Sequence, residues 1–402
     1  MTSEWHEVPL RELVGYISKG IAPSYAEEAS ETTIRVLNQK CNRNFRISYG
    51  DSRLHDTLKK KVPPERYVKP DDILINSTGA GTAGRIAQIE DVPSATTIDG
   101  HMILIRSNRK VTQKFLGYAL KAHQWEVLQL DEGSTGQTEL NRDRLLDEIM
   151  INYPVSFDEQ NAIVGTLESI DRKLIVNEQL NDNLEQQAQA IYHERFETIS
   201  PNDLPSEWRI VTLGEVATIS SKSFNPLKEP EILLEHYSIP AFDEARFPVF
   251  ELSTSIKSNK FIIDASCFMI SKLNPTTKRV WKPYCLTGNA VCSTEFIVYK
   301  AKDKTITDFL YSVIDSNSFS DFMCSHVTGS TGSRQRTTPS DTLSYELILP
   351  SEDELAKFQS LVSPMYAQIR INAIENDRLK RLRDSLLPKL MSGEIDVSTI
   401  QL

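Results

Sequence analysis

A glycine-rich segment offers the most familiar chemistry in the sequence. Gly79, Gly81 and Gly84 have the spacing GxGxxG and follow an apolar run, DDILINS, that is typical of a strand. A dinucleotide site also needs a helix that begins at the last glycine, because the amides at its N-terminus bind the pyrophosphate. The residues from Arg85 to Ile89 alternate in polarity instead. We therefore predict a glycine-rich turn between two strands, and keep a nucleotide-dependent oxidoreductase only as an alternative that tight NAD binding would support.

Other catalytic and metal-binding patterns are incomplete. Asn274-Pro275-Thr276-Thr277 resembles the Asn-Pro-Pro-aromatic element of adenine methyltransferases but lacks the aromatic residue that stacks a flipped base. The sequence has no P-loop, its seven histidines form no HExxH pattern, and its five cysteines are never spaced CxxC. The scattered cysteines indicate a reducing cytoplasm, and no apolar run approaches the ~18 residues of a membrane span. We therefore expect a cytoplasmic chain that is not an enzyme and binds no metal or cofactor itself.

Basic residues gather in two segments of an acidic chain. The net charge is -10, yet Thr33 to Pro70 holds ten Lys/Arg against three Asp/Glu, and Ile256 to Lys282 holds six against one. Residues 158–200 hold nine acids and three bases. Proteins that read DNA place Lys and Arg on phosphates and polar side chains against base edges. We therefore predict DNA-binding residues in both halves of the chain: Lys40, Arg43, Arg46, Ser77, Thr78, Arg85, Gln137, Lys272, Asn274, Lys278, Arg279, Arg334, Gln335 and Arg336.

The chain repeats itself, which indicates a duplicated domain. The pattern that begins at Trp5 (WxxVxLxE) returns at Trp208, displaced by 203 residues. The tetrapeptide GSTG at 133–136 returns at 329–332, and in both copies a further 18 residues lead to a strand-like segment that closes at Pro154 or Pro350. With the looser echo of Asp72-Ile73-Leu74-Ile75 at 267–271, four landmarks in one order predict two similar globular units with short β-rich runs and helical patches.

A long helical pattern follows each proline. Apolar residues advance by alternating threes and fours, the 3.5-residue period of a coiled-coil seam. Over nearly 40 residues such a helix would extend roughly 60 Å. The predicted interface consists of Ile163, Leu167, Ile170, Leu174, Asn177, Asn181, Leu184 and Ile191 in the first helix, and of Phe358, Val362, Met365, Ile369, Asn372, Asn376, Leu379 and Leu386 in the second.

Two asparagines interrupt each stripe at equivalent places, displaced by 195 residues. Helices carried by two similar domains close compactly around a pseudo-twofold axis, which makes them antiparallel. An axis near position 179 brings Asn177 opposite Asn376, and Asn181 opposite Asn372. Buried Asn pairs penalise slips in register, because a displaced amide would face Leu or Ile. The alternative is that these asparagines face solvent or a partner subunit.

The combined pattern resembles the specificity subunit of type I restriction-modification systems over essentially the whole chain. The resemblance rests on the duplicated domain, the strand and glycine turn DILINSTGAGTAGR, the transition NYPVSFDEQNAIV into the first helix, and the closing segment SLLPKLMSGEIDV at 385–397. The second half departs from the first in two places. Leu355 stands where the first half has Gln160, and SKLNPTTKR replaces the glycine-rich turn.

The resemblance implies an α+β fold in which two similar target-recognition domains are separated by two long helices in an antiparallel, pseudo-twofold coiled coil. The expected boundaries are target-recognition domain 1 at 1–156, the central spacer helix at 157–199, target-recognition domain 2 at 200–350, and the second spacer helix with a tail at 351–402.

The implied function is a non-catalytic reader of double-stranded DNA. Each domain would read one half of a bipartite, asymmetric site. The helices would dock two modification subunits that bind S-adenosylmethionine, and restriction subunits would join the full complex, with no role for a membrane. A coiled-coil scaffold with two protein-binding domains is the alternative.

Overall fold

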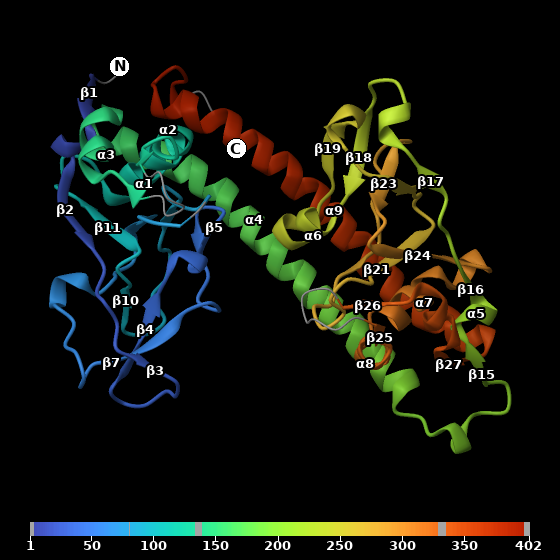
Figure 1. Ribbon diagram of the computed structural model, residues 1–402. Helices are drawn as coiled ribbons and strands as arrows, with labels where there is room; N and C mark the ends of the chain where they lie inside the picture. The colour runs from blue at the N-terminus through green and yellow to red at the C-terminus, as the bar shows by residue number, and fades with distance from the viewer. Residues whose placement is uncertain (1–3, 80, 133–138, 329–334, 398–402) are drawn as a thin grey trace. The chain divides into compact units, whose positions relative to one another are not determined.

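The computed structural model describes residues 4–79, 81–132, 139–328 and 335–397. The chain divides into two compact units: unit 1 contains residues 1–173 and 380–402, and unit 2 contains residues 174–379. Both divisions fall inside long helices, α4 (Phe157–Tyr192) and α9 (Glu352–Met391) (Figure 1). The helices begin within a residue of the predicted positions 157 and 351. Each unit includes portions of both helices, because these portions pack into the globular cores.

Unit 1 combines two four-stranded sheets with helices. The first sheet has the order β2-β11-β8-β9 and is antiparallel, whereas the second has the order β10-β4-β7-β3 with β10 and β4 parallel. A separate antiparallel pair, β1 with β14, joins the N-terminal residues to the strand before α4. The elements are β1 (Trp5–Pro9), β2 (Val14–Lys19), β3 (Tyr25–Ala26), β4 (Thr33–Leu37), β5 (Asn42–Arg43), β6 (Arg46–Ile47), β7 (Arg53–Asp56), β8 (Ile73–Asn76), β9 (Ile86–Gln88), β10 (Thr96–Ile98), β11 (Met102–Ser107), α1 (Gln113–Ala122), α2 (Gln124–Val127), β12 (Asp131–Glu132), β13 (Glu139–Leu140), α3 (Arg142–Glu148) and β14 (Met150–Pro154).

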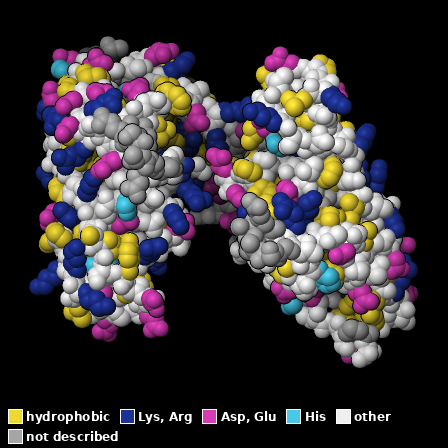
Figure 2. Space-filling view, viewed as in Figure 1, with side chains coloured by type: hydrophobic (Ala, Val, Ile, Leu, Met, Phe, Trp, Pro, Cys, Tyr) yellow, Lys and Arg dark blue, Asp and Glu magenta, His cyan; other side chains and the backbone are white. Residues whose placement is uncertain are grey.

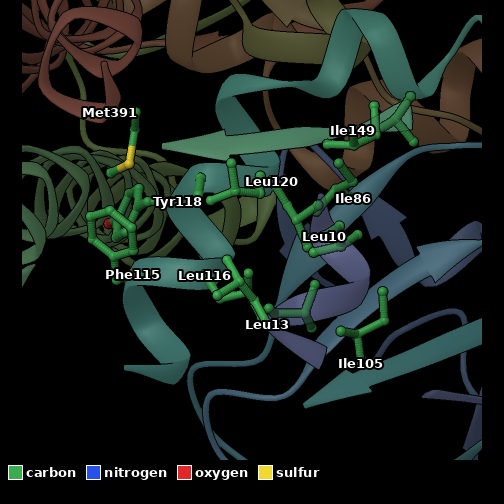
Figure 3. Packing of buried hydrophobic residues seen from close by; sticks show 14 of the residues in the cluster. Leu10, Leu13, Ile86, Ile105, Phe115, Leu116, Tyr118, Leu120, Ile149 and Met391 are labelled. Carbon is green, nitrogen blue, oxygen red and sulfur yellow. The ribbon is translucent and has the colours of Figure 1, made fainter. Parts of the chain in front are cut away.

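The core of unit 1 joins the first sheet to α1 and to both long helices. Helix α1 buries Phe115, Leu116, Ala119 and Leu120, which recur at the 3.6-residue period and therefore share one face. Figure 3 shows α1 side chains beside residues such as Leu10, Leu13 and Ile105. The same cluster takes in Ile163 and Leu167 of α4 and Leu387, Leu390 and Met391 of α9. The long helices thus belong to the folded domain as well as to each other.

Unit 2 repeats the plan of unit 1. Its pair β15 with β27 corresponds to β1 with β14, and its sheet β16-β24-β21-β22 has the same strand order as β2-β11-β8-β9. The predicted duplication is therefore confirmed in the topology. The elements are β15 (Arg209–Thr212), α5 (Leu213–Val216), β16 (Ala217–Ile219), β17 (Ser223–Phe224), β18 (Leu233–Tyr237), α6 (Ile239–Ala245), β19 (Val249–Leu252), β20 (Lys260–Ile262), β21 (Cys267–Ser271), β22 (Val280–Trp281), β23 (Ala290–Ser293), β24 (Phe296–Ala301), α7 (Thr307–Ile314), α8 (Asn317–Ser325), β25 (Val327–Thr328), β26 (Arg336–Thr337) and β27 (Glu346–Leu349).

The units differ in their second sheets. Unit 2 has five strands in the order β17-β20-β23-β18-β19, where unit 1 has four. The strand pair β18 with β23 is parallel, like β4 with β10. After β4 the chain of unit 1 forms a short 3-10 turn, Gln39–Cys41, and the hairpin β5-β6. After β18 the chain of unit 2 forms helix α6 instead.

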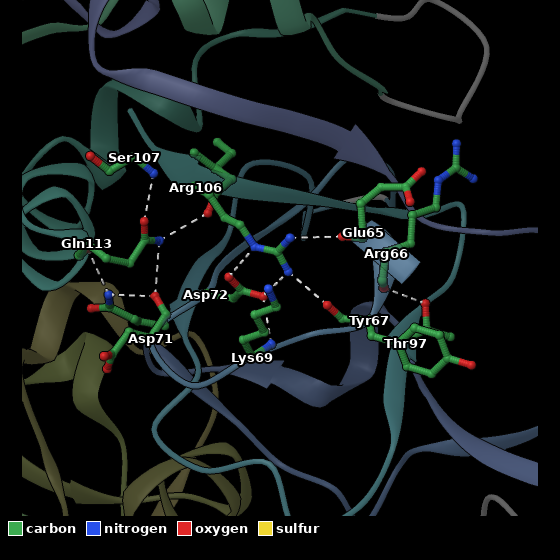
Figure 4. A network of polar contacts seen from close by, with 12 residues as sticks. Glu65, Arg66, Tyr67, Lys69, Asp71, Asp72, Thr97, Arg106, Ser107 and Gln113 are labelled. Atoms are coloured by element: carbon green, nitrogen blue, oxygen red, sulfur yellow. Dashed lines mark hydrogen bonds and ion pairs between the residues drawn. The ribbon is translucent and has the colours of Figure 1, made fainter. Parts of the chain in front are cut away.

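A buried ion pair fixes the start of β8 in unit 1. Arg106 on β11 donates to both carboxylate oxygens of Asp72 at 2.7 Å and also to the carbonyl oxygens of Glu65 and Tyr67 (Figure 4). Asp72 is only 3% exposed. Hydrogen bonding to Asp72 raises the pKa of Arg106, although burial opposes this. The network holds the strand that leads into the glycine-rich loop.

An aromatic cluster joins the long helices to unit 2. Phe196, just beyond α4, has its ring centroid 5.4 Å from that of Phe309 on α7 and 5.2 Å from that of Phe358 on α9. Tyr192 at the end of α4 packs against the same two rings. Leu355 also lies in this cluster. In unit 1 the matching Gln160 is buried and hydrogen-bonds to the backbone of Pro154 and Thr112. An apolar contact thus replaces a polar one between the two halves.

Candidate nucleic-acid interface

The glycine-rich turn in unit 1 connects two strands, as predicted. Gly79, Gly81 and Gly84 have φ values of 116°, 69° and 84°, a backbone region that side chains with a Cβ rarely enter. The loop begins at the end of β8 and leads into strand β9, so no helix N-terminus is present to bind a pyrophosphate. This geometry does not support a dinucleotide site.

Four segments that are distant in sequence meet around this loop. The side-chain amide of Asn76 donates to the carbonyl oxygen of Gln39 at 3.1 Å. Thr78 Oγ1 lies 2.7 Å from Nδ1 of His101, within hydrogen-bond distance. The backbone amide of Leu140 donates to the carbonyl oxygen of Ser77 at 2.8 Å. The predicted residue Thr78 therefore lies in a polar cluster with Gln39 and His101, neither of which the sequence had indicated for this site.

Four predicted cations lie near the same loop. Lys40 is exposed on the 3-10 turn, and Arg43 is exposed on hairpin β5-β6, where it is paired in register with Arg46. Arg46 is half-buried and has a further interaction. Arg85 donates from Nη2 to the carbonyl oxygen of Gly81 at 3.2 Å, so its charge faces a neutral acceptor. The structure thus brings the predicted basic residues of the first half close to the glycine-rich loop.

Two predictions in the first half have other outcomes. Ser77 is fully buried, and its hydroxyl donates to the carbonyl oxygen of Gly100 at 3.5 Å. The hydroxyl of Ser77 thus faces the protein interior in this structure, and its role in DNA binding stays a prediction. Gln137 and the first GSTG tetrapeptide lie outside the described residues.

The corresponding loop in unit 2 follows β21 and has a similar setting. The backbone amide of Asn274 donates to the carbonyl oxygen of Gln335 at 2.9 Å, and the amide of Thr337 donates to that of Lys272 at 3.1 Å. Asn274 adopts a left-handed conformation with φ of 48°, and its Oδ1 is buried and accepts no hydrogen bond from the described part of the chain. Residues 272–279 therefore meet residues 335–337, as the glycine-rich loop meets residues 139–140 in unit 1.

Three basic side chains at this second loop bind carboxylates, and Lys272 is half-buried without a carboxylate partner among the described residues. Arg279 donates to both oxygens of Asp243, at 2.6 and 2.9 Å, and Arg336 donates to both oxygens of Glu295, at 3.0 and 3.1 Å. Lys278 lies 3.0 Å from Asp315 Oδ1. Burial raises the pKa of Asp315, although Lys278 opposes this shift. Acidic side chains from elsewhere in the chain thus compensate three of the six basic residues at 256–282, namely Lys278, Arg279 and Lys282. Arg334 and the second GSTG lie outside the described residues.

The acidic partners in unit 2 could not be recognised from the sequence. Asp243 is 36 residues from Arg279, and Glu295 is 41 residues from Arg336. No local motif connects residues at such separations. Figure 2 shows the result on the visible face of unit 2, where Lys and Arg side chains are interspersed with Asp and Glu.

The helices in unit 2 pair through the predicted asparagines. Asn177 Nδ2 donates to Asn376 Oδ1 at 2.8 Å, and Asn372 Nδ2 donates to Asn181 Oδ1 at 2.8 Å. Residue numbers rise from 177 to 181 along α4 while those of the partners fall from 376 to 372 along α9, which confirms that the helices are antiparallel in the predicted register. In addition, Asn177 donates to Glu375 and Asn376 donates to the carbonyl oxygen of Leu174. These amides are therefore satisfied within the helix pair.

The other predicted seam positions are buried to different degrees. Fully buried positions are Ile163, Leu167, Ile170, Leu174, Phe358 and Val362, and partly buried positions are Leu184, Ile191, Met365, Ile369, Leu379 and Leu386. Ile163 and Leu167 also pack into the core of unit 1, and Phe358 and Val362 into that of unit 2. The apolar stripe therefore serves both helix pairing and domain attachment.

A buried ionic cluster attaches the helices within unit 1. The carboxylate of Asp171 on α4 accepts hydrogen bonds from Tyr118 at 2.8 Å, Lys121 at 3.1 Å and Arg383 at 3.0 Å. Burial would raise the pKa of Asp171, but Lys121 and Arg383 outweigh it and hold the pKa below its usual value. Burial lowers the pKa of Lys121 despite the same carboxylate. The cluster links α1, α4 and α9.

Within the ranges given above, no three His, Cys, Asp or Glu side chains are grouped so that they could hold a metal ion. In those same ranges, no helix is long and apolar enough to span a membrane.

Comparisons with known proteins show similarity to type I specificity subunits. Residues 2–186 match the type I restriction modification DNA specificity domain. The specificity subunit of the type I restriction enzyme MjaIX from Methanocaldococcus jannaschii is 25% identical over 384 residues, which cover 88% of this chain and 84% of that protein. The HindI specificity subunit from Haemophilus influenzae is 33% identical over 93 residues, which cover 23% of this chain and 20% of that protein.

The fold is similar to that of a solved S subunit. The crystal structure of a type I restriction-modification S subunit from M. genitalium superimposes with a TM-score of 0.58 at 16% identity, covering 97% of this chain and 96% of that one. The shared features are those derived above, namely a repeated α+β domain and two long helices. Residues 2–186 therefore match a DNA specificity domain, and most of the chain is similar in sequence to a type I specificity subunit and in fold to a type I S subunit.

Proposed function

We propose that each globular domain reads one half of a bipartite, asymmetric DNA site. The observation that carries this proposal is the repeated loop arrangement at the end of equivalent strands. In unit 1 the loop after β8 meets residues 139–140, and in unit 2 the loop after β21 meets residues 335–337. The same scaffold thus presents two sets of loops, and loops on a rigid scaffold are the usual place for recognition residues.

The two loop sets differ in chemistry, which supports an asymmetric site. The first contains flexible glycines with Thr78 beside His101. The second contains Asn274 in a left-handed turn and Arg336 bound to Glu295. Base edges in the major groove are distinguished by their pattern of donors and acceptors. Different donors and acceptors in equivalent places should therefore select different bases in the two half-sites.

The helix pair is proposed to set the distance between the half-sites. Its register is defined by Asn177 with Asn376 and Asn181 with Asn372. A slipped register would leave these amides against apolar neighbours, and a buried polar group without a partner costs about 1–3 kcal/mol. A spacer that resists slipping keeps the two readers at one separation, so we expect selectivity for the number of base pairs between half-sites.

The outer faces of the helices are proposed to dock two modification subunits. Val176 and Leu180 on α4 and Ile371 on α9 are large apolar side chains that are 41–55% exposed. The segment 158–200 is acidic, which suits a protein partner better than DNA phosphates. In this proposal the modification subunits bind S-adenosylmethionine and methylate adenine, and restriction subunits join the full complex. This chain contributes recognition and assembly only.

Selection of bound duplexes from a random pool tests the proposal. The chain, assembled with its modification subunits, is expected to enrich sequences with two fixed half-sites and a constant gap. Recovery of no preferred sequence would contradict DNA reading and favour the coiled-coil scaffold with two protein-binding domains. Recovery of one continuous site would contradict two separate readers.

A further inference from the structure

The two candidate DNA-binding loops differ in how their positive charges are balanced. In unit 2, Arg279 is bound to Asp243 and Arg336 to Glu295, each through two hydrogen bonds. Bidentate pairs of this kind hold the guanidinium in a fixed orientation. The positive charge of each arginine is therefore neutralised by the carboxylate in the same hydrogen-bonded pair.

The cations of unit 1 have no such counterpart in the described part of the chain. Lys40 and Arg43 are exposed, and neither makes an ion pair with a described carboxylate. Arg85 bonds only to a backbone carbonyl among these residues, so its charge is not neutralised. All three lie around the glycine-rich loop. A phosphate that approaches this loop meets uncompensated positive charge, whereas one that approaches Arg279 or Arg336 meets a pair with no net charge.

We propose that the two halves contribute unequally to DNA binding: the first supplies most of the phosphate-neutralising charge through Lys40, Arg43 and Arg85. In the second, Arg279 and Arg336 are held in charge-compensated pairs, and among the described residues of that loop Lys272 alone lacks a carboxylate partner. This inference rests on the proposed function and adds a division of labour to it. Neutralising a phosphate releases condensed counterions, so each such contact makes the logarithm of affinity fall with the logarithm of salt concentration by a slope of about 0.9. The salt dependence of binding should therefore originate mainly in unit 1.

Removal of charge from unit 1 is the first test. In the complex with modification subunits, the double variant Lys40→Ala, Arg43→Ala is expected to reduce the salt slope by about two units, one for each lost phosphate contact. The matched control is Lys257→Ala, Lys304→Ala, which removes two exposed charges from unit 2 outside the candidate loop. An unchanged slope in the first variant, or an equal reduction in the control, would overturn the proposal.

Release of charge in unit 2 is the second test. The variant Glu295→Gln keeps the shape of the side chain but leaves Arg336 without its compensating charge, so the salt slope is expected to become steeper by about one unit. The matched control is Asp264→Asn, which removes the carboxylate that binds Lys300. Asp264 precedes β21, whereas the candidate loop follows β21, so this charge is removed away from the loop. Equal slopes for the two variants would overturn the proposal.

The tests separate this inference from the proposed function. A complex that selects no DNA sequence contradicts the proposed function itself. A complex that selects a bipartite site while both charge tests leave the slope unchanged contradicts only the unequal division of charge between the halves.

Discussion

The buried asparagine pair gives the most direct quantitative test of the helix register. Asn177 is 1% exposed and Asn376 is 6% exposed, and the amide of the first donates to the carbonyl oxygen of the second at 2.8 Å. If Leu replaces either residue, the remaining amide keeps its polar atoms but faces an apolar side chain. A buried polar group without its partner costs about 1–3 kcal/mol.

The magnitude follows from a double-mutant cycle. Asn177→Leu leaves Asn376 Oδ1 without its donor, whereas Asn376→Leu leaves Asn177 Nδ2 still bonded to Glu375. The double variant leaves neither amide. The apolar burial gained by each Leu appears in both the single and the double variants and therefore cancels. At the lower limit of about 1 kcal/mol for the one orphaned oxygen, the double variant should be more stable than the sum of the single variants predicts by about 1 kcal/mol.

Urea unfolding followed by far-UV circular dichroism measures this difference from the shifts in midpoint at a common slope. Asn183→Leu is the matched control, because Asn183 is exposed on the same helix and the substitution should change stability by less than about 0.5 kcal/mol. Additivity of the two single variants within about 0.5 kcal/mol would refute the reasoning, because it would mean that the two amides do not satisfy each other.

Four further predictions follow from other contacts. Arg106→Met should lower the free energy of unfolding in urea titrations by about 3–5 kcal/mol, because it leaves the buried Asp72 carboxylate without its cation. The control Arg11→Met breaks an exposed ion pair and should have little effect. Because the folded-state pKa of Asp171 is lowered, its ionised carboxylate should stabilise the fold fully above the unfolded pKa of ~3.9, and this stabilisation should be lost as the pH falls through the folded value. Asp171→Asn should therefore be less stable than the original chain at neutral pH, and its free energy of unfolding should fall less steeply with acidification. Exchange of residues 1–156 for those of a relative should change one half-site in duplex selection, and a change in both would contradict independent reading. Replacement of all four seam asparagines by Leu should broaden the range of half-site spacings that the complex binds, whereas an unchanged spacing preference would show that other contacts fix the register.

Local features of the chain were predictable because they depend on residues that are close in sequence. The alternation after Gly84 indicated a strand, and β9 follows the turn as expected. The repeat indicated two similar domains, and the sheets β2-β11-β8-β9 and β16-β24-β21-β22 share one strand order. The 3.5-residue stripe and the displacement of 195 residues also determined the helix register, because a regular helix converts spacing in sequence directly into position along its axis.

The character of the candidate interface depended on the tertiary structure. Polarity alone suggested that Ser77 was available to DNA, but the packing of the loop buries it. The run 256–282 is basic in sequence, yet Asp243 and Asp315 reach Arg279 and Lys278 from other parts of the chain. Composition sums charges along the chain, whereas a ligand meets charges as they are arranged in space. The sequence by itself therefore determined the repeated domains and the paired helices, and only the folded chain decided which of its charges are compensated.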